Sequence, residues 1–108
     1  MSAERSEWYR RADALAREGR IEDAERLIRD AVPHVAFAYV TAELHADRMR
    51  RLRGEGDHAG AARALADARR WIDNYASMAT SGGEGYALAA DRDRFLATLP
   101  DVYDADGG

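Results

Sequence analysis

The sequence predicts an all-α fold of antiparallel helical hairpins, with about five helices. Three observations support this expectation. Apolar residues recur at helical spacing along most of the 108-residue chain, no segment shows the Val/Ile/Thr-rich alternation of a strand, and only two prolines occur. Hairpins of this kind pack as a short α-solenoid or as a compact bundle.

The first two predicted helices lie on either side of Gly19. One runs from about Ser2 to Glu18, and the next from about Ile21 to Val32, where Pro33 stops it. Gly19 ends the first helix because glycine adopts a left-handed conformation at low cost. On the outward face of the second helix we expect two acid–arginine pairs at i,i+4 spacing, namely Glu22/Arg26 and Glu25/Arg29.

The third predicted helix, about His34 to Arg53, is apolar nearly all round in its first half, so we expect neighbours on two sides of it. After the turn at Gly54 to Gly56, Asp57 is a suitable N-cap for a fourth helix that reaches about Ala79. A fifth helix, ending near Leu99, would cap the last hairpin. These elements predict one domain over residues 1–99 and an acidic, disordered tail over 100–108.

Composition excludes several functional classes. The chain has no cysteine, which removes disulfides, thiolate zinc sites and cysteine nucleophiles. Its net charge of -4 opposes binding to nucleic acid or to acidic membranes, and no apolar run is long enough to span a bilayer. The N-terminus has no apolar signal core, so a cytoplasmic location is expected. No catalytic motif occurs, and we expect neither an enzyme nor a cofactor.

A set of residues around Gly19 resembles the signature of a tetratricopeptide (TPR) repeat. The set consists of Trp8, Ala12, Leu15, Ile21, Ala24, Ile28 and Ala31. A weaker copy follows 37 residues later, with Gly56 in the role of Gly19. In that copy the matching positions hold His45, Met49, Leu52, His58, Ala61, Leu65 and Ala68.

The resemblance implies a function in protein or peptide binding, because the first helices of successive TPR hairpins line a groove. The residues at those positions are Tyr9, Asp13, Arg17, Glu43, Arg50 and Arg53. The set carries both signs of charge and the chain has no lysine, so the family's lysine and asparagine grip on a peptide carboxylate is not expected. The alternative is that these are ordinary solvated positions.

A different class of function could use the start of the fifth helix. There Ser81, Gly82 and Gly83 could offer backbone N–H groups to an anion, as in a phosphate- or nucleotide-responsive regulator. The competing interpretation is a capping turn in which the Glu84 side chain satisfies those donors. The three histidines lack metal-site spacing, and His45 is expected to be half-buried and bonded to a neighbouring carboxylate or backbone group.

The apolar surface of the third helix also predicts self-association. Phe37, Tyr39 and Val40 cannot all face the same neighbour. Unless the fifth helix covers them, a homodimer is expected, because a two-fold pairing of identical patches is the commonest solution.

Overall fold

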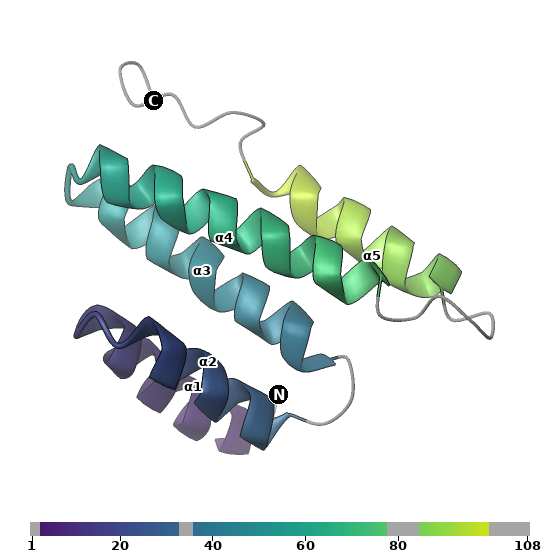
Figure 1. Ribbon diagram of the computed structural model, residues 1–108, viewed down its shortest axis with the longest axis horizontal. Helices are drawn as coiled ribbons and strands as arrows, with labels where there is room; N and C mark the ends of the chain where they lie inside the picture. Colours follow the sequence, from purple (N-terminus) through teal and green to yellow (C-terminus); the bar gives the residue numbers. More distant parts are fainter. Residues whose placement is uncertain (1–2, 33–35, 78–84, 100–108) are drawn as a thin grey trace.

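The computed structural model describes residues 3–32, 36–77 and 85–99, and these residues form an all-α fold, as the sequence predicts (Figure 1). Within those ranges the helices are α1 (Ala3–Arg17), α2 (Ile21–Ala31), α3 (Ala36–Gly54), α4 (His58–Ser77) and α5 (Gly85–Ala97). Helices α3 and α4 lie side by side, with the α1–α2 hairpin packed against α3 and with α5 packed against α4 (Figure 1). The predicted tail at 100–108 lies outside the described residues.

The turns of the two hairpins have the same backbone geometry. Gly19 and Gly56 both adopt positive φ, of 87° and 85°. The residue after each glycine donates its N–H to the carbonyl of a leucine: Arg20 to Leu15 and Asp57 to Leu52, both at 2.9 Å. This six-residue closure is typical of a helix that ends in a left-handed glycine. Both predicted turn glycines are therefore confirmed.

The predicted N-cap of the fourth helix is also confirmed. Asp57 Oδ1 accepts a hydrogen bond of 2.9 Å from the backbone N–H of Gly60, which satisfies one of the free donors in the first turn. A β-carbon added at Gly60 would lie 2.5 Å from Asp57 Oδ2. The aspartate cap and the absence of a side chain at Gly60 therefore belong together. By contrast, the N-cap residue of α2, Arg20, makes no side-chain cap hydrogen bond.

The apolar core consists of two clusters, one on each side of α3. Val40 and Leu44 face the first hairpin, where they pack with Ala12, Ala24 and Ile28. The opposite side of α3 packs on α4 and α5. That larger cluster contains Ala38, Ala42, Ala46, Met49, Ala61, Ala64, Leu65, Ala68, Ile72, Tyr75, Leu88, Phe95 and Leu99. The predicted central position of this helix, with neighbours on two sides, is confirmed.

Aromatic rings attach α5 to the first half of α3. The ring of Tyr39 meets those of Tyr75 and Phe95 edge to face, at centroid distances of 5.1 and 5.5 Å. Tyr75 also donates its hydroxyl to Asp91 Oδ2 at 2.9 Å, and burial followed by this bond raises the pKa of Tyr75 to about 12. The rings of Phe37 and Trp71 also meet edge to face, at a centroid distance of 6.0 Å.

These contacts bear on the argument for a dimer through α3. Phe37 and Tyr39 pack on rings of α4 and α5, and Val40 belongs to the cluster of the first hairpin. Tyr39 and Val40 thus have neighbours within the chain, whereas Phe37 stays partly exposed, and the oligomeric state itself stays a prediction. Every helix in the described ranges is too short or too polar to cross a bilayer.

Candidate functional site

Side chains of α1 and α3 meet along a polar strip between the two hairpins. The Tyr9 hydroxyl of α1 donates to Asp47 of α3. One turn further along α1, Asp13 accepts from Arg17 at 2.8 Å and lies 3.6 Å from Arg51 Nη1 of α3. The first helices of the two hairpins are thus adjacent, as the predicted groove requires.

Most of the predicted groove residues contribute to this α1/α3 strip. Tyr9, Asp13 and Arg17 belong to the contacts above, and Arg50 extends the strip through an ion pair of 3.2 Å with Asp47. Glu43 is half-buried on α3, and its charge acts on the Tyr9 phenol. Arg53 is half-buried in the last turn of α3.

Sequence reasoning missed Asp47 and Arg51, which are the α3 residues that actually bridge to α1. The signal was available, because positions 43, 47 and 51 follow one another at i,i+4 spacing and so share one face of the helix. Reading only the positions implied by the family resemblance left two of these three out.

The electrostatics of the strip keep the Tyr9 phenol protonated. Burial raises its pKa above the ordinary value, and the Asp47 hydrogen bond and the surrounding carboxylates raise it further. The phenol therefore acts as a hydrogen-bond donor and not as a base. The strip as a whole alternates carboxylates and guanidiniums, so it suits a ligand that carries charges of both signs.

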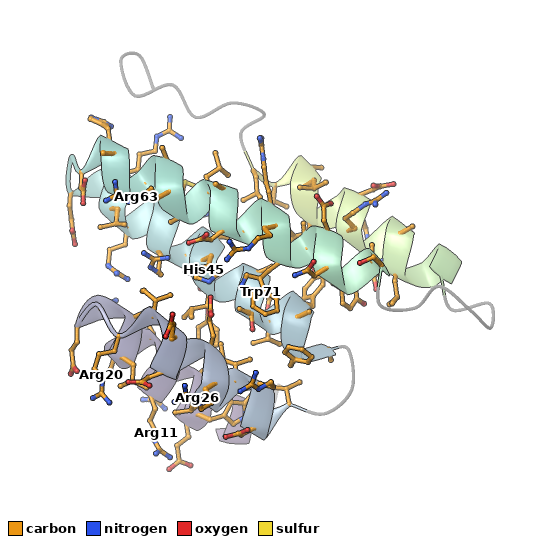
Figure 2. All side chains as sticks on the ribbon, viewed as in Figure 1. Arg11, Arg20, Arg26, His45, Arg63 and Trp71 are labelled. Atoms are coloured by element: carbon orange, nitrogen blue, oxygen red, sulfur yellow. The ribbon has the colours of Figure 1, made fainter. Side chains whose placement is uncertain are left out.

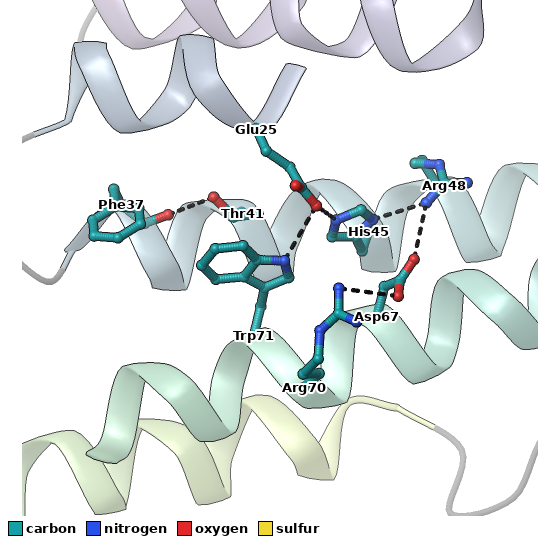
Figure 3. Close-up of polar contacts among 8 residues, drawn as sticks. All are labelled: Glu25, Phe37, Thr41, His45, Arg48, Asp67, Arg70 and Trp71. Atoms are coloured by element: carbon teal, nitrogen blue, oxygen red, sulfur yellow. Dashed lines mark hydrogen bonds and ion pairs between the residues drawn. The ribbon is translucent and has the colours of Figure 1, made fainter. Parts of the chain in front are cut away.

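A second polar cluster, the seam network, connects the first hairpin to the second on the side of α2 and α4 (Figure 3). Glu25 of α2 places its Oε2 atom 2.8 Å from His45 Nε2 of α3, and Trp71 Nε1 of α4 donates to the same oxygen at 3.2 Å. His45 is 0% exposed. The predicted bond from His45 to a neighbouring carboxylate is confirmed, although the side chain is more deeply buried than expected.

Arg48 sets the tautomer of His45. A guanidinium only donates hydrogen bonds, so the 2.8 Å contact between Arg48 Nη1 and His45 Nδ1 requires an unprotonated Nδ1. The ring proton is therefore on Nε2, where it is donated to Glu25. Behind the ring, Arg48 lies 3.8 Å from Asp67 Oδ2, and Arg70 lies 3.3 Å from Asp67 Oδ1 (Figure 3).

The seam network changes the titration of its members. The hydrogen bond from His45 is the largest effect on Glu25 and lowers its pKa, and this outweighs partial desolvation. Burial lowers the pKa of Arg48, and the Asp67 carboxylate opposes that shift. Arg48 Nε is buried and has no hydrogen-bond partner among the described residues.

The inward direction of Glu25 corrects one expectation from the sequence. Glu25 bonds to His45 and Trp71 and does not pair with Arg29, because its side chain turns toward α3. Arg26 does not pair with Glu22 either, since its guanidinium binds Asp23 at 3.1 Å. Neither predicted i,i+4 pair on α2 is present.

A pocket of about 290 Å³ opens beside the seam network. It is lined by Glu22, Glu25, Arg26 and Arg29 of α2, Phe37 of α3 and Trp71 of α4. The four α2 side chains line one wall of the pocket, and the two aromatic rings come from the second hairpin. Figure 2 shows Arg26 on the first hairpin and Trp71 between the two hairpins.

The remaining predicted sites receive no structural test. Ser81, Gly82, Gly83 and His34 lie outside the described residues. His58 is exposed at the first position of α4. In the described part of the chain, no group of three or more His, Asp or Glu side chains is arranged to hold a metal ion.

In comparisons with known proteins, no family profile matches the chain, and no curated protein or solved structure matches it either. The TPR-like assignment therefore stays a prediction.

Proposed function

We propose that this protein is a small TPR-like adaptor that binds a protein or peptide segment on the α1/α3 strip. The observation that supports the proposal is the contact of Tyr9 with Asp47 and of Asp13 with Arg51, which brings the polar faces of two hairpins with identical turns into one surface. A surface formed by the first helices of successive hairpins is the binding surface of helical-repeat proteins.

The charges on the strip define the expected ligand. Arg17 and Arg50 are more than half exposed, so their ion pairs with Asp13 and Asp47 contribute only about 0–1 kcal/mol each. A ligand can exchange such pairs for its own at little cost. We therefore expect a segment with both acidic and basic side chains, in which the acidic groups replace Asp13 and Asp47 as partners of the arginines.

A peptide array probed with labelled protein tests the proposal, with fluorescence anisotropy of the best peptides in solution as the quantitative step. Arg17→Glu and Arg50→Glu should each weaken binding by about tenfold, a loss of about 1.4 kcal/mol. Arg63→Glu provides a matched control, because Arg63 is exposed on α4, which contributes no residue to the strip (Figure 2). An equal loss in the control, or no loss in either strip variant, would exclude this surface.

The alternative function, a phosphate- or nucleotide-responsive regulator, depends on Ser81, Gly82 and Gly83, and no described residue favours it. Calorimetric titration with inorganic phosphate and nucleotides tests it directly. The cytoplasmic location and the homodimer expected from the sequence are also part of the proposal.

A further inference from the structure

Four charged side chains of α2 line the pocket, and their signs are arranged antisymmetrically along the helix. In the order of the sequence they are Glu22, Glu25, Arg26 and Arg29. Reversing the direction of the helix exchanges each glutamate with an arginine, because Glu22 and Arg29 lie equally far from the midpoint between Glu25 and Arg26. A second copy of α2, placed antiparallel across a two-fold axis at that midpoint, therefore presents an arginine to each glutamate.

The outermost charges of this set are available to a partner. Glu22 and Arg29 are exposed, and neither forms a hydrogen bond or ion pair with another residue in the part of the chain that the structure describes. The cause is local, because Arg26 binds Asp23 and Glu25 binds His45 and Trp71. Glu22 and Arg29 are seven residues apart, which is about 10 Å along the helix axis.

Two aromatic rings lie beside these charges. Phe37 and Trp71 are only partly buried and line the pocket together with the α2 side chains. Both hydrogen bonds to Glu25 end on Oε2, so no described group bonds to its Oε1 atom. An arginine side chain placed over the Trp71 ring would find both a π face and a carboxylate oxygen there.

From these observations we infer that α2 is a self-recognition surface through which two copies of the chain associate antiparallel. Glu22 of each copy faces Arg29 of the other, and Arg26 of each copy lies over the Trp71 and Phe37 rings of the other near Glu25. This inference deepens the proposed homodimer and is independent of the α1/α3 strip, which is formed by other side chains of other helices. The strip stays open to a ligand in both the monomer and the dimer.

The size of the surface sets the strength of the association. Helix α2 has 11 residues and is roughly 16 Å long, so the pairing buries less than the ~1,200–2,000 Å² of a standard interface. The dimer is therefore weak, and its charge pairs are screened by salt. Association belongs in the range of about 10 µM to 1 mM at low ionic strength, and it declines as salt is added.

Charge reversal at positions 22 and 29 tests the inference by sedimentation equilibrium at low ionic strength. The parent should rise with concentration from 12.0 kDa toward twice that mass. Because position 22 of each copy faces position 29 of the other, Glu22→Arg creates two pairs of facing arginines and Arg29→Glu creates two pairs of facing glutamates. Each variant should raise the dissociation constant of the dimer by at least about tenfold. The double variant Glu22→Arg/Arg29→Glu should restore it. An equimolar mixture of the two single variants should form a heterodimer, because unlike charges then meet at both ends.

The double variant also separates recognition from helix stability. An arginine in the first turn of α2 and a glutamate in its last turn both oppose the helix dipole, so their effects on stability add in the double variant. The effects on association cancel instead. Arg63→Glu, the same charge change on α4, should leave the dimer unchanged. A parent that stays at 12.0 kDa over the whole concentration range, single variants that associate like the parent, or a double variant without rescue would each overturn the inference.

The outcome is distinguishable from a failure of the proposed function. If Arg29→Glu is monomeric and still binds the array peptide, both the self-recognition surface and the strip are supported. If it dimerises like the parent while Arg50→Glu loses the peptide, the strip is supported and the inference about α2 is wrong.

Discussion

The two hairpins have the same type of turn and a similar pattern of small residues, yet only the second hairpin forms the centre of the molecule. Ala24 in α2 and Ala61 in α4 are both fully buried, and Gly19 and Gly56 close their turns in the same way. The second hairpin differs in length, with helices of 19 and 20 residues against 15 and 11. It also packs on both sides, because the first hairpin covers α3 and α5 covers α4.

The difference is visible at a single matched position. Ala31 is exposed at the end of α2, whereas Ala68 is fully buried in α4, which continues for nine more residues to Ser77. A similar local signal therefore gives a similar turn, but the length of the helices and the neighbours available decide how much of each hairpin is buried. Substitutions at matched positions in the two hairpins test this comparison.

The largest effects are expected from removing a buried isoleucine in each cluster. Ile28→Ala and Ile72→Ala each leave a cavity at a fully buried site and should lower the free energy of unfolding by about 2–5 kcal/mol. Amide hydrogen exchange should separate them, because Ile28→Ala accelerates exchange mainly in α1 and α2, whereas Ile72→Ala accelerates it in α3, α4 and α5. Identical exchange patterns would mean that the two clusters unfold as one unit.

Overpacking the hairpin crossings should have the next largest effect. Ala24→Leu and Ala61→Leu add side-chain volume at two fully buried alanines, at an expected cost of about 1–3 kcal/mol each. Urea unfolding measures both variants. A parent-like stability for Ala24→Leu would contradict the close approach of α1 and α2.

The contact between the hairpins should show in the pH dependence of stability. The pKa of Glu25 is lowered in the fold from 4.5, so its contribution is fully present above that value and is lost as pH falls through the lower folded value. Glu25→Gln should lower the free energy of unfolding by about 1–3 kcal/mol near neutral pH. It should also reduce the loss of stability as the pH falls.

Urea unfolding over a series of acidic pH values measures this slope. Glu55→Gln is the control, since Glu55 is exposed in the turn before α4 and belongs neither to the seam network nor to the α2 surface, and the slope in this variant should match that of the parent. An unchanged slope in Glu25→Gln would show that the bonds from His45 and Trp71 do not hold the hairpins together.

The smallest effects are expected at the two turns. The β-carbon added by Gly19→Ala or Gly56→Ala would have no atom within 4 Å. Only the left-handed backbone conformation is therefore unfavourable for alanine, and each variant should lower the free energy of unfolding by about 1–2 kcal/mol. The two costs should agree within a few tenths of a kcal/mol if the turns are equivalent. Thermal unfolding of the two variants side by side measures the difference.

The fold could largely be predicted because its signals are local. Gly19 and Gly56 mark turns, Asp57 marks an N-cap, and the apolar first half of α3 indicates a central helix. Each of these depends on a few neighbouring residues. The ends of the helices agree with the expected ones to within about two residues wherever they are described, which is the usual uncertainty of helix boundaries.

The candidate site was predicted less completely because its contacts join distant residues. The position of Glu25 suggests an i,i+4 pair with Arg29, and nothing local indicates that the carboxylate turns inward to Trp71, 46 residues away. The bond from Tyr9 to Asp47 spans 38 residues in the same way. Such pairings depend on how the hairpins stack, which periodicity within one helix does not specify.

The hydrogen bond from Trp71 to Glu25 gives the protein an intrinsic optical probe. The indole belongs to the second hairpin and its acceptor to the first, so separation of the hairpins exposes the Trp71 N–H to water and changes the emission of the ring. The chain has one other tryptophan, Trp8. A Trp8→Phe variant would leave a single fluorophore that reports, in real time and without a label, whether the first hairpin is docked.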